Sequence, residues 1–292
     1  MSWDYQCLSD LLTLQRIGDS EFHSTLHDIN INGRIFGGQI LGQALAAAIQ
    51  TVDTQRIPTA LQLLFLRGGT DAAPVEFQIT PLQEGSRFSS RHVRALQSGQ
   101  LLCDAHVSFQ ESPAGIEYSA PAPLNIPSPE SLLTLSQLGD KYADRAATGD
   151  YLLVEKSCLH LCLINHEDHL FESGSEPKLA YWLKLRNPLR EPDESPLHYA
   201  ALAYLSDFWV AASSMTPHAP LATTRRKLYI SSLNHSLWFH APVRGDSWLL
   251  FVSENIRSAQ GRGLSVARIY DREYRHVATL SQECLISEAK VI

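Results

Sequence analysis

Two long apolar stretches with helical character divide the hydrophobic pattern of the chain. The first, over residues 36–50, reads FGGQILGQALAAAIQ and carries small residues on nearly every face. Such a helix suits a place where other backbone wraps closely around it. The second, over residues 195–215, reads SPLHYAALAYLSDFWVAASSM, with Ser195 as a suitable N-cap and Pro196 in the first turn. We expect one buried helix in each stretch.

Strand-like runs follow both predicted helices in the same order. After the first helix come LQLLFLR, VEFQITPLQ, SSRHVRALQ and LLCDAHVSFQ, with a hairpin turn predicted at Ser98-Gly99. After the second come KLYISSLNHSLWFH, SWLLFVSENI, LSVARIYD and HVATLSQECLI, and two further runs precede it, YLLVEKSCLHLCLI and KLAYWLKLR. The repeat predicts an α+β protein with an antiparallel sheet curled around a central helix in each half. Side by side, the two halves would form one continuous sheet.

A segment rich in proline and serine, SPAGIEYSAPAPLNIPSPES, separates the two halves. This composition is typical of a linker. We therefore predict an N-terminal unit over residues 1–115, a linker over residues 116–149 and a C-terminal unit over residues 150–292.

The composition argues against several classes of protein. The 292 residues are 44% hydrophobic and 19% charged, which is too apolar for a disordered chain. A net charge of −7 argues against a nucleic-acid surface, and no apolar run reaches the roughly 18 residues of a membrane span. The start of the chain lacks the pattern of a signal peptide, and five irregularly spaced cysteines predict no disulfide framework. We expect a soluble, cytoplasmic protein.

An acidic residue within the second apolar stretch is the strongest candidate for chemistry. At helical spacing, Asp207 has only apolar neighbours three and four positions away. A carboxylate in such surroundings is costly unless it is paired or hydrogen-bonded. A narrow solvated stripe or a bond to a nearby backbone amide would also explain it. Because the helix is apolar nearly all round, we favour a functional role.

Two polar residues on predicted strands are further candidates. Period-two alternation in HVATLSQECLI places Gln282 on an otherwise apolar face, so its amide either braces the core or points to a ligand. In KLYISSLNHS, alternation places Ser232 on one face with Ile230 and Asn234. The adjacent Ser231 leaves the choice of hydroxyl open.

In order along the chain, four runs resemble the acyl-CoA thioesterase II family: FGGQILGQAL, YLSDFWVA, SLNHSLWFH and VATLSQECL. The resemblance extends from about Phe36 to Ser287. It implies a double hotdog fold, hydrolysis of acyl-CoA to fatty acid and CoA by an activated water, a role in lipid metabolism and no cofactor. In that family a carboxylate, a hydroxyl and a glutamine position the water, and by position these are Asp207, Ser232 and Gln282. Threonine is more usual in the family at the position of Ser232.

Thioester hydrolysis needs a held water, a base, and donors for the developing oxyanion. Asp207 can accept the proton of the water, while the other two side chains orient it and a helix N-terminus supplies donors. The first half cannot match this set. Residues 35–49 contain no acid, and alternation places Phe109 rather than Gln110 on the apolar face. We therefore predict one competent site per chain.

The substrate implied by the resemblance is an acyl-CoA. Gly37, Gly38 and Gln39 open the first helix and are predicted to line the acyl or thioester end of the site. Arg225 and Arg226 could meet the CoA phosphates, although a solvated charge cluster explains them equally well. Hotdog sheets generally pair, so we expect a homo-oligomer, either a dimer or a tetramer.

Two other functions remain open. The run from Asp193 to His198 resembles a motif of hotdog enoyl-CoA hydratases, and a non-catalytic acyl-CoA binding protein would have the same fold. The cysteines and histidines of residues 158–169 look like metal ligands, but their spacing fits no known zinc finger. A strand with Cys158, His160 and Cys162 on one face explains them more simply. We expect no metal.

Overall fold

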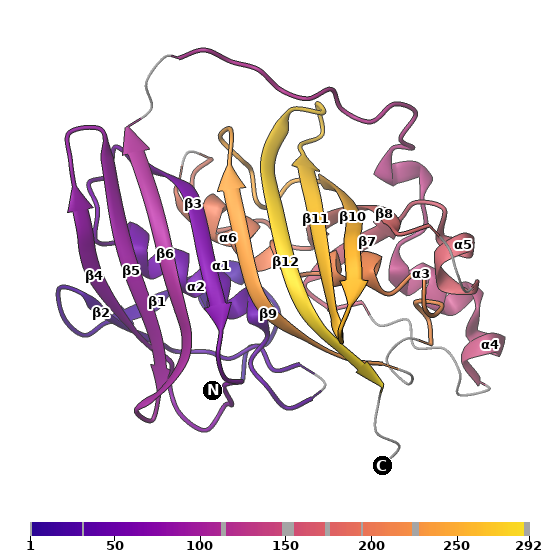
Figure 1. Ribbon diagram of the computed structural model, residues 1–292, viewed down its shortest axis with the longest axis horizontal. Coiled ribbons are helices and arrows are strands. Elements are labelled where there is room, and N and C mark those ends of the chain that lie inside the picture. The colour runs from indigo at the N-terminus through magenta and orange to yellow at the C-terminus, as the bar shows by residue number, and fades with distance from the viewer. Residues whose placement is uncertain are drawn as a thin grey trace.

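The computed structural model describes residues 2–30, 32–111, 115–147, 155–172, 176–193, 195–223 and 228–288. Within these ranges twelve strands form one antiparallel sheet, in the order β1-β2-β4-β5-β6-β3-β9-β12-β11-β10-β8-β7 (Figure 1). The strands of the first half are β1 (Leu14–Arg16), β2 (Glu21–Ser24), β3 (Arg56–Phe65), β4 (Glu76–Glu84), β5 (Phe88–Gln97) and β6 (Gln100–Glu111). Those of the second half are β7 (Leu159–Leu163), β8 (Lys178–Leu185), β9 (Leu228–Phe239), β10 (Leu249–Ala259), β11 (Arg262–Tyr270) and β12 (His276–Glu288).

Strands β3 and β9 join the two halves at the middle of the sheet. Leu61 pairs with Leu237 and Leu63 pairs with His235 in antiparallel register. Each half also has one long helix, α2 (Gly37–Ile49) and α6 (Leu197–Ser206), and Figure 1 shows both behind the sheet. The predicted continuous sheet with a central helix in each half is confirmed.

Small residues allow α2 and α6 to pack with their backbones in close approach. A Cβ atom at Gly38 would lie 2.3 Å from the Tyr204 carbonyl oxygen, and one at Gly42 would lie 3.0 Å from the Ala200 carbonyl oxygen. A larger residue at either position would push the helices apart. The prediction that other backbone packs closely against the first helix is therefore confirmed.

The second predicted helix was too long. Helix α6 ends at Ser206, and Asp207 is its C-cap residue rather than a residue within the helix. Trp209 adopts a left-handed conformation with φ of 67°, which an α-helix cannot continue through, and a 3-10 helix, η2 (Val210–Ser214), follows. At the start of the helix, Pro196 is the N-cap residue. The hydroxyl of Ser195 accepts a hydrogen bond from the backbone N–H of Leu197 at 3.3 Å.

Short helices accompany the main elements. Helix α1 (Leu8–Leu12) packs on α2, and α5 (His166–Leu170) follows β7. The segment after residue 115 crosses to the far end of the sheet in Figure 1, where it forms η1 (Pro129–Ser131), α3 (Leu135–Lys141) and α4 (Ala143–Ala147). Fully buried leucines attach α3 beside β7, a helix that the proline-rich composition did not predict. Among the described residues, no helix is long and apolar enough to cross a membrane.

Candidate active site

Three side chains that were predicted to act together meet at the end of α6. Asp207 caps α6, Ser232 lies on β9 and Gln282 lies on β12. The Gln282 amide nitrogen donates to Asp207 Oδ1 at 2.5 Å and to Ser232 Oγ at 2.7 Å. The Ser232 hydroxyl donates to Asp207 Oδ1 at 3.2 Å. Carboxylate, hydroxyl and amide thus form one hydrogen-bonded triangle, in which the hydroxyl is that of Ser232 rather than Ser231.

A β-bulge on β9 directs Ser232 toward this triangle. Glu283 of β12 pairs with Asn234, and the next residue, Cys284, pairs with Ser232, so Leu233 is the extra residue. Beyond the bulge the alternation is reversed, and Asn234 lies on the outer face, where its amide nitrogen is 3.3 Å from Glu283 Oε2. The expectation that Ser232 and Asn234 share a face is therefore wrong, because simple alternation does not allow for an inserted residue.

The first turn of α2 also meets the carboxylate. The backbone N–H of Gly38 interacts with Asp207, and a Cβ atom at Gly37 would lie 2.5 Å from Asp207 Oδ2. Gln39 is fully buried, and its side-chain oxygen accepts the Asp28 N–H at 2.6 Å, so it braces the preceding segment. Two residues predicted to meet the CoA phosphates lie outside the described part of the chain, Arg225 and Arg226.

Burial sets the basicity of Asp207. It raises the pKa of this carboxyl from 3.8 to about 6, against the opposing effects of hydrogen bonds from Gln282 and Ser232 and of the positive charge of Lys156. The carboxyl is therefore mostly ionised at pH 7, but it is a stronger base than an exposed aspartate. This combination suits a group that accepts a proton near neutral pH.

A buried histidine beside the triangle, His235, was not singled out from the sequence. His235 pairs across the strands with Gln282 and is fully buried, and burial lowers its pKa to about 3. The imidazole is therefore neutral, and its Nε2 lies 2.9 Å from the hydroxyl of Ser206, which donates to the Ala203 carbonyl oxygen at 2.8 Å. This arrangement fixes the last turn of α6 before Asp207. The apolar alternation of the residues after His235 could have placed it inside.

Both halves of the chain match domains of one protein family. Residues 27–110 match the acyl-CoA thioesterase N-terminal domain, and residues 145–286 match the acyl-CoA thioesterase C-terminal domain. The chain belongs to the acyl-CoA thioesterase family. The resemblance drawn from the four sequence runs is thereby confirmed, and so is the reaction class, hydrolysis of acyl-CoA thioesters.

Individual relatives cover nearly all of this thioesterase. Human acyl-coenzyme A thioesterase 8 is 32% identical over 263 residues, which are 87% of this chain and 80% of the human protein. Acyl-CoA thioesterase 2 of Haemophilus influenzae is 29% identical over 283 residues, 96% of each chain. The crystal structure of acyl-CoA thioesterase II TesB2 from Mycobacterium marinum has a TM-score of 0.73 at 26% identity and covers 97% of this chain and 98% of its own. These likenesses confirm the double hotdog fold.

The hydratase alternative finds no support in this thioesterase. His198 is buried, and its Nε2 lies 3.1 Å from the Pro192 carbonyl oxygen. Asp193 is exposed and forms an ion pair of 2.6 Å with Arg244. Asp193 and His198 therefore lie at the start of α6, away from the Asp207 triangle at its other end. The relatives named above are thioesterases, and none of them points to a hydratase or to a non-catalytic binding protein.

The predicted cysteine face on β7 is only partly present in the thioesterase. Cys162 packs with Trp182 in a small cluster on one side of the sheet. Cys158 precedes the strand and lies 3.7 Å from the Tyr204 hydroxyl in the main core, because the chain turns at residues 157–158. Among the described residues, two other groups have metal-ligand spacing, His92 with Asp104 and His106, and Glu21 with His23 and Glu76.

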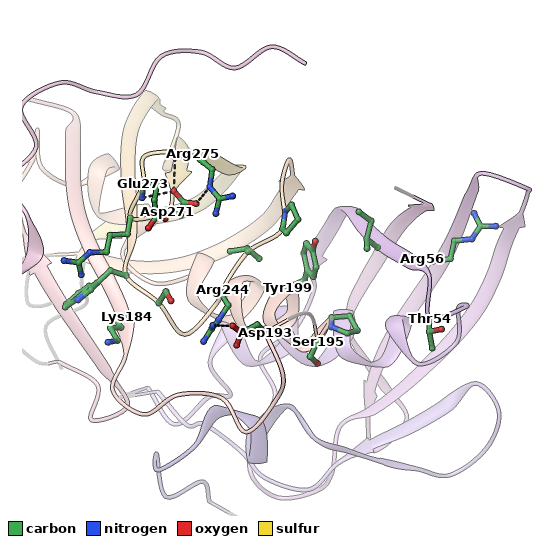
Figure 2. Close-up of a pocket in the computed structure, with 17 residues that line it drawn as sticks. Thr54, Arg56, Lys184, Asp193, Ser195, Tyr199, Arg244, Asp271, Glu273 and Arg275 are labelled. Carbon is green, nitrogen blue, oxygen red and sulfur yellow. Dashed lines mark hydrogen bonds and ion pairs between the residues drawn. The ribbon is translucent and has the colours of Figure 1, made fainter. Parts of the chain in front are cut away.

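A cavity of about 640 Å³ lies beside the start of α6, at the opposite end of the helix from Asp207 (Figure 2). Its lining includes Asp193 and Asp271, but both carboxylates are already bound. Asp193 pairs with Arg244 at 2.6 Å, and Asp271 pairs with Arg275 at 2.6 Å. Figure 2 shows both pairs in the cavity lining. The two aspartates in the cavity lining are therefore ion-paired, unlike Asp207 in the triangle.

Proposed function

We propose that Asp207 is the general base of this thioesterase and that it activates a water for attack on the thioester carbonyl. The water oxygen bonds to the carbonyl carbon while its proton passes to Asp207. Collapse of the tetrahedral intermediate breaks the carbon–sulfur bond. The proton held by Asp207 passes to the leaving thiolate, so the CoA thiol and the free acid are released and the carboxylate is restored. The observation that carries this proposal is the contact of one Asp207 oxygen with both Ser232 and Gln282.

Ser232 and Gln282 orient the water in this proposal. Gln282 donates from one nitrogen to both partners, which fixes the direction of the Ser232 hydroxyl toward Asp207. The positive end of α2 meets the same carboxylate through Gly38, so its dipole favours negative charge at this place. The arrangement thus combines a base, two orienting groups and a helix N-terminus within hydrogen-bonding distance.

We infer one catalytic site per chain, because the counterpart in the first half lacks the required groups. Each half has a bulge at the same place in its central strand pair, at Thr59 in β3 and at Leu233 in β9. When β3 and β9 are aligned on these bulge residues, Pro58 corresponds to Ser232. Val107, opposite Leu61, then occupies the place of Gln282, which pairs with His235. Neither replacement can orient a water.

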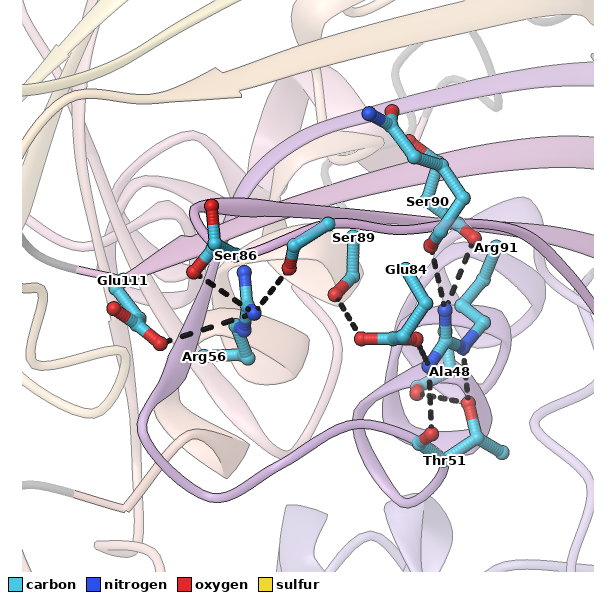
Figure 3. A network of polar contacts seen from close by, with 11 residues as sticks. Ala48, Thr51, Arg56, Glu84, Ser86, Ser89, Ser90, Arg91 and Glu111 are labelled. Carbon is cyan, nitrogen blue, oxygen red and sulfur yellow. Dashed lines mark hydrogen bonds and ion pairs between the residues drawn. The ribbon is translucent and has the colours of Figure 1, made fainter.

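An arginine occupies the space beside that counterpart. Arg91 pairs with Val107 as Ser265 pairs with Gln282, so the two strand positions correspond. The guanidinium is buried and binds Glu84 at 2.6 Å and the carbonyl oxygen of Thr51 at 2.9 Å, at the end of α2 (Figure 3). The positive charge of Arg91 at the C-terminal end of α2 stabilises the fold there. It supplies no base.

Assembly and location are further proposals. We propose a homo-oligomer that forms through the outer face of the sheet, where Leu64, Trp238 and Leu264 are each at least one-third exposed. Light scattering after size-exclusion chromatography measures the mass of the particle. We also propose a cytoplasmic location and a role in lipid metabolism, the latter supported by the acyl-CoA substrate.

The function is tested by thiol release from saturated acyl-CoA esters of increasing chain length. We expect release of CoA, with a preferred length that reports the depth of the acyl site. The Asp207→Asn protein in the same assay identifies the base. Binding of acyl-CoA without release of thiol would contradict the proposal.

A further inference from the structure

A buried carboxylate next to the active site has three donors from distant parts of the chain. Asp28 is fully buried and accepts from the hydroxyls of Tyr5 at 3.1 Å and Tyr204 at 2.8 Å. Lys156 donates to the same Asp28 oxygen as Tyr204. Asp28 belongs to the first half, whereas Lys156 precedes β7 in the second half. A buried ion pair contributes little net stability by itself.

The backbone of Asp28 is attached to the start of α2. Its carbonyl oxygen accepts the N–H of Phe36 at 2.8 Å, and its N–H donates to the Gln39 side chain at 2.6 Å. Phe36 is the N-cap residue of α2. The Lys156 ammonium lies 3.7 Å from the centroid of the Phe36 ring, a close cation–π contact. The ion pair thus holds the first turn of α2 through both the backbone and the ring.

That first turn carries the groups that meet the proposed base. Gly37 is in close contact with Asp207, and the Gly38 N–H interacts with its carboxylate. Tyr204, which binds Asp28, lies on α6 three residues before Asp207. The ion pair therefore connects to both helices whose ends form the site.

Lys156 also supplies positive charge to the carboxylate of Asp207. The other groups that face Asp207 from the described elements carry no positive charge. They are the Gly38 N–H from α2, Ser232 from β9, Gln282 and Cys284 from β12, and Tyr181 from β8. Burial raises the pKa values of the Tyr181 and Cys284 side chains, so both are neutral near pH 7. Among these neighbours, the Lys156 ammonium is the charge that favours ionised Asp207.

We propose that Lys156 and Asp28 are positioning residues for thioester hydrolysis. Asp28 holds Lys156 against Phe36, and Lys156 in turn keeps the start of α2 against Asp207 and directs positive charge at that carboxylate. The proposal rests on the assignment of Asp207 as the base.

The test compares Lys156→Met with the double variant Asp28→Asn/Lys156→Met. The single variant leaves a buried carboxylate without its cation and is expected to lose stability. The double variant has neither charge, so its melting temperature should recover toward that of the parent protein. The measurement is the pH dependence of kcat from pH 5 to 9, with Lys178→Met as a control because Lys178 is exposed on β8.

We expect the acid limb of the profile to move to higher pH in both Lys156 variants and to stay in place in the control. If the apparent pKa rises by about one unit, ionised Asp207 falls about fivefold at pH 6 and is nearly unchanged at pH 9. A stable double variant whose acid limb coincides with that of the parent would overturn the proposal, because a purely structural pair affects folding alone.

The Asp207→Asn protein separates this proposal from the one on which it rests. If this protein keeps the parental activity and acid limb, the base assignment fails and the positioning proposal fails with it. If it is inactive while the double variant keeps an unshifted limb, only the positioning proposal fails.

Discussion

Replacement of Asp207 with asparagine should give a stable but inactive protein. Asparagine keeps the size of the side chain and an oxygen that can accept from Gln282 and Ser232, but it has no charge and negligible basicity. If Asp207 is the general base, kcat should fall by roughly two to four orders of magnitude, as is usual for the loss of such a group. The assay is thiol release from an acyl-CoA between pH 5 and 9.

The structure also fixes the sign of the stability change. Burial raises the pKa of Asp207 from 3.8 to about 6, so the folded state binds this proton more tightly than the unfolded chain does. The contribution of Asp207 to stability therefore falls as the pH rises from 3.8 to about 6, and it is level above that range. A rise of this size corresponds to roughly 3 kcal/mol at pH 7 as an upper bound. Because asparagine has no such charge to bury, the melting temperature should be unchanged or raised at pH 7.

The two measurements together decide the role of Asp207. A carboxylate that only braces the end of α6 would make the variant less stable while the folded fraction kept most of its activity, and this outcome would refute the base assignment. Asp19→Asn is a matched control, since the Asp19 side chain is fully exposed and its ion pair with Arg16 lies on the surface. It should change neither quantity measurably.

Three further predictions concern the partners of Asp207 and the metal question. Gln282→Ala should lower kcat at least about tenfold, because one positioned donor is typically worth a few kcal/mol. Gln110→Ala should affect stability alone, because Val107 rather than Gln110 takes the place of Gln282 in the first half; equal losses of kcat would contradict the one-site inference. Ser232→Thr should keep most of the activity because it keeps the hydroxyl, while Ser232→Ala should lose at least about tenfold, and an active alanine variant would remove the hydroxyl from the mechanism. Turnover should survive exhaustive treatment with a metal chelator. Loss of turnover that zinc restores would contradict the expectation that the cysteines and histidines of residues 158–169 bind no metal.

Local patterns of the sequence determined most of the architecture. Apolar periodicity predicted the central helix of the first half and the strands after both helices, because each depends on which residues of one segment face the core. Ser98 and Gly99 both have positive φ, 51° and 76°, in the hairpin that their residue types predicted. Alternation also placed Phe109 inside, where it is fully buried. The motif order was enough to indicate the family and the three residues that now meet.

Tertiary structure decided the features that depend on contacts between distant segments. The bulge at Leu233 is defined by pairing with β12, so alternation within β9 could not reveal it or show that Ser232 and Asn234 lie on opposite faces. Trp209 ends α6 by adopting a conformation that its residue type disfavours, which only the surrounding packing can impose. Asp28 and Lys156 are 128 positions apart, and neither has a local pattern that marks it. Their pairing exists because the fold brings the two halves together around the same pair of helices.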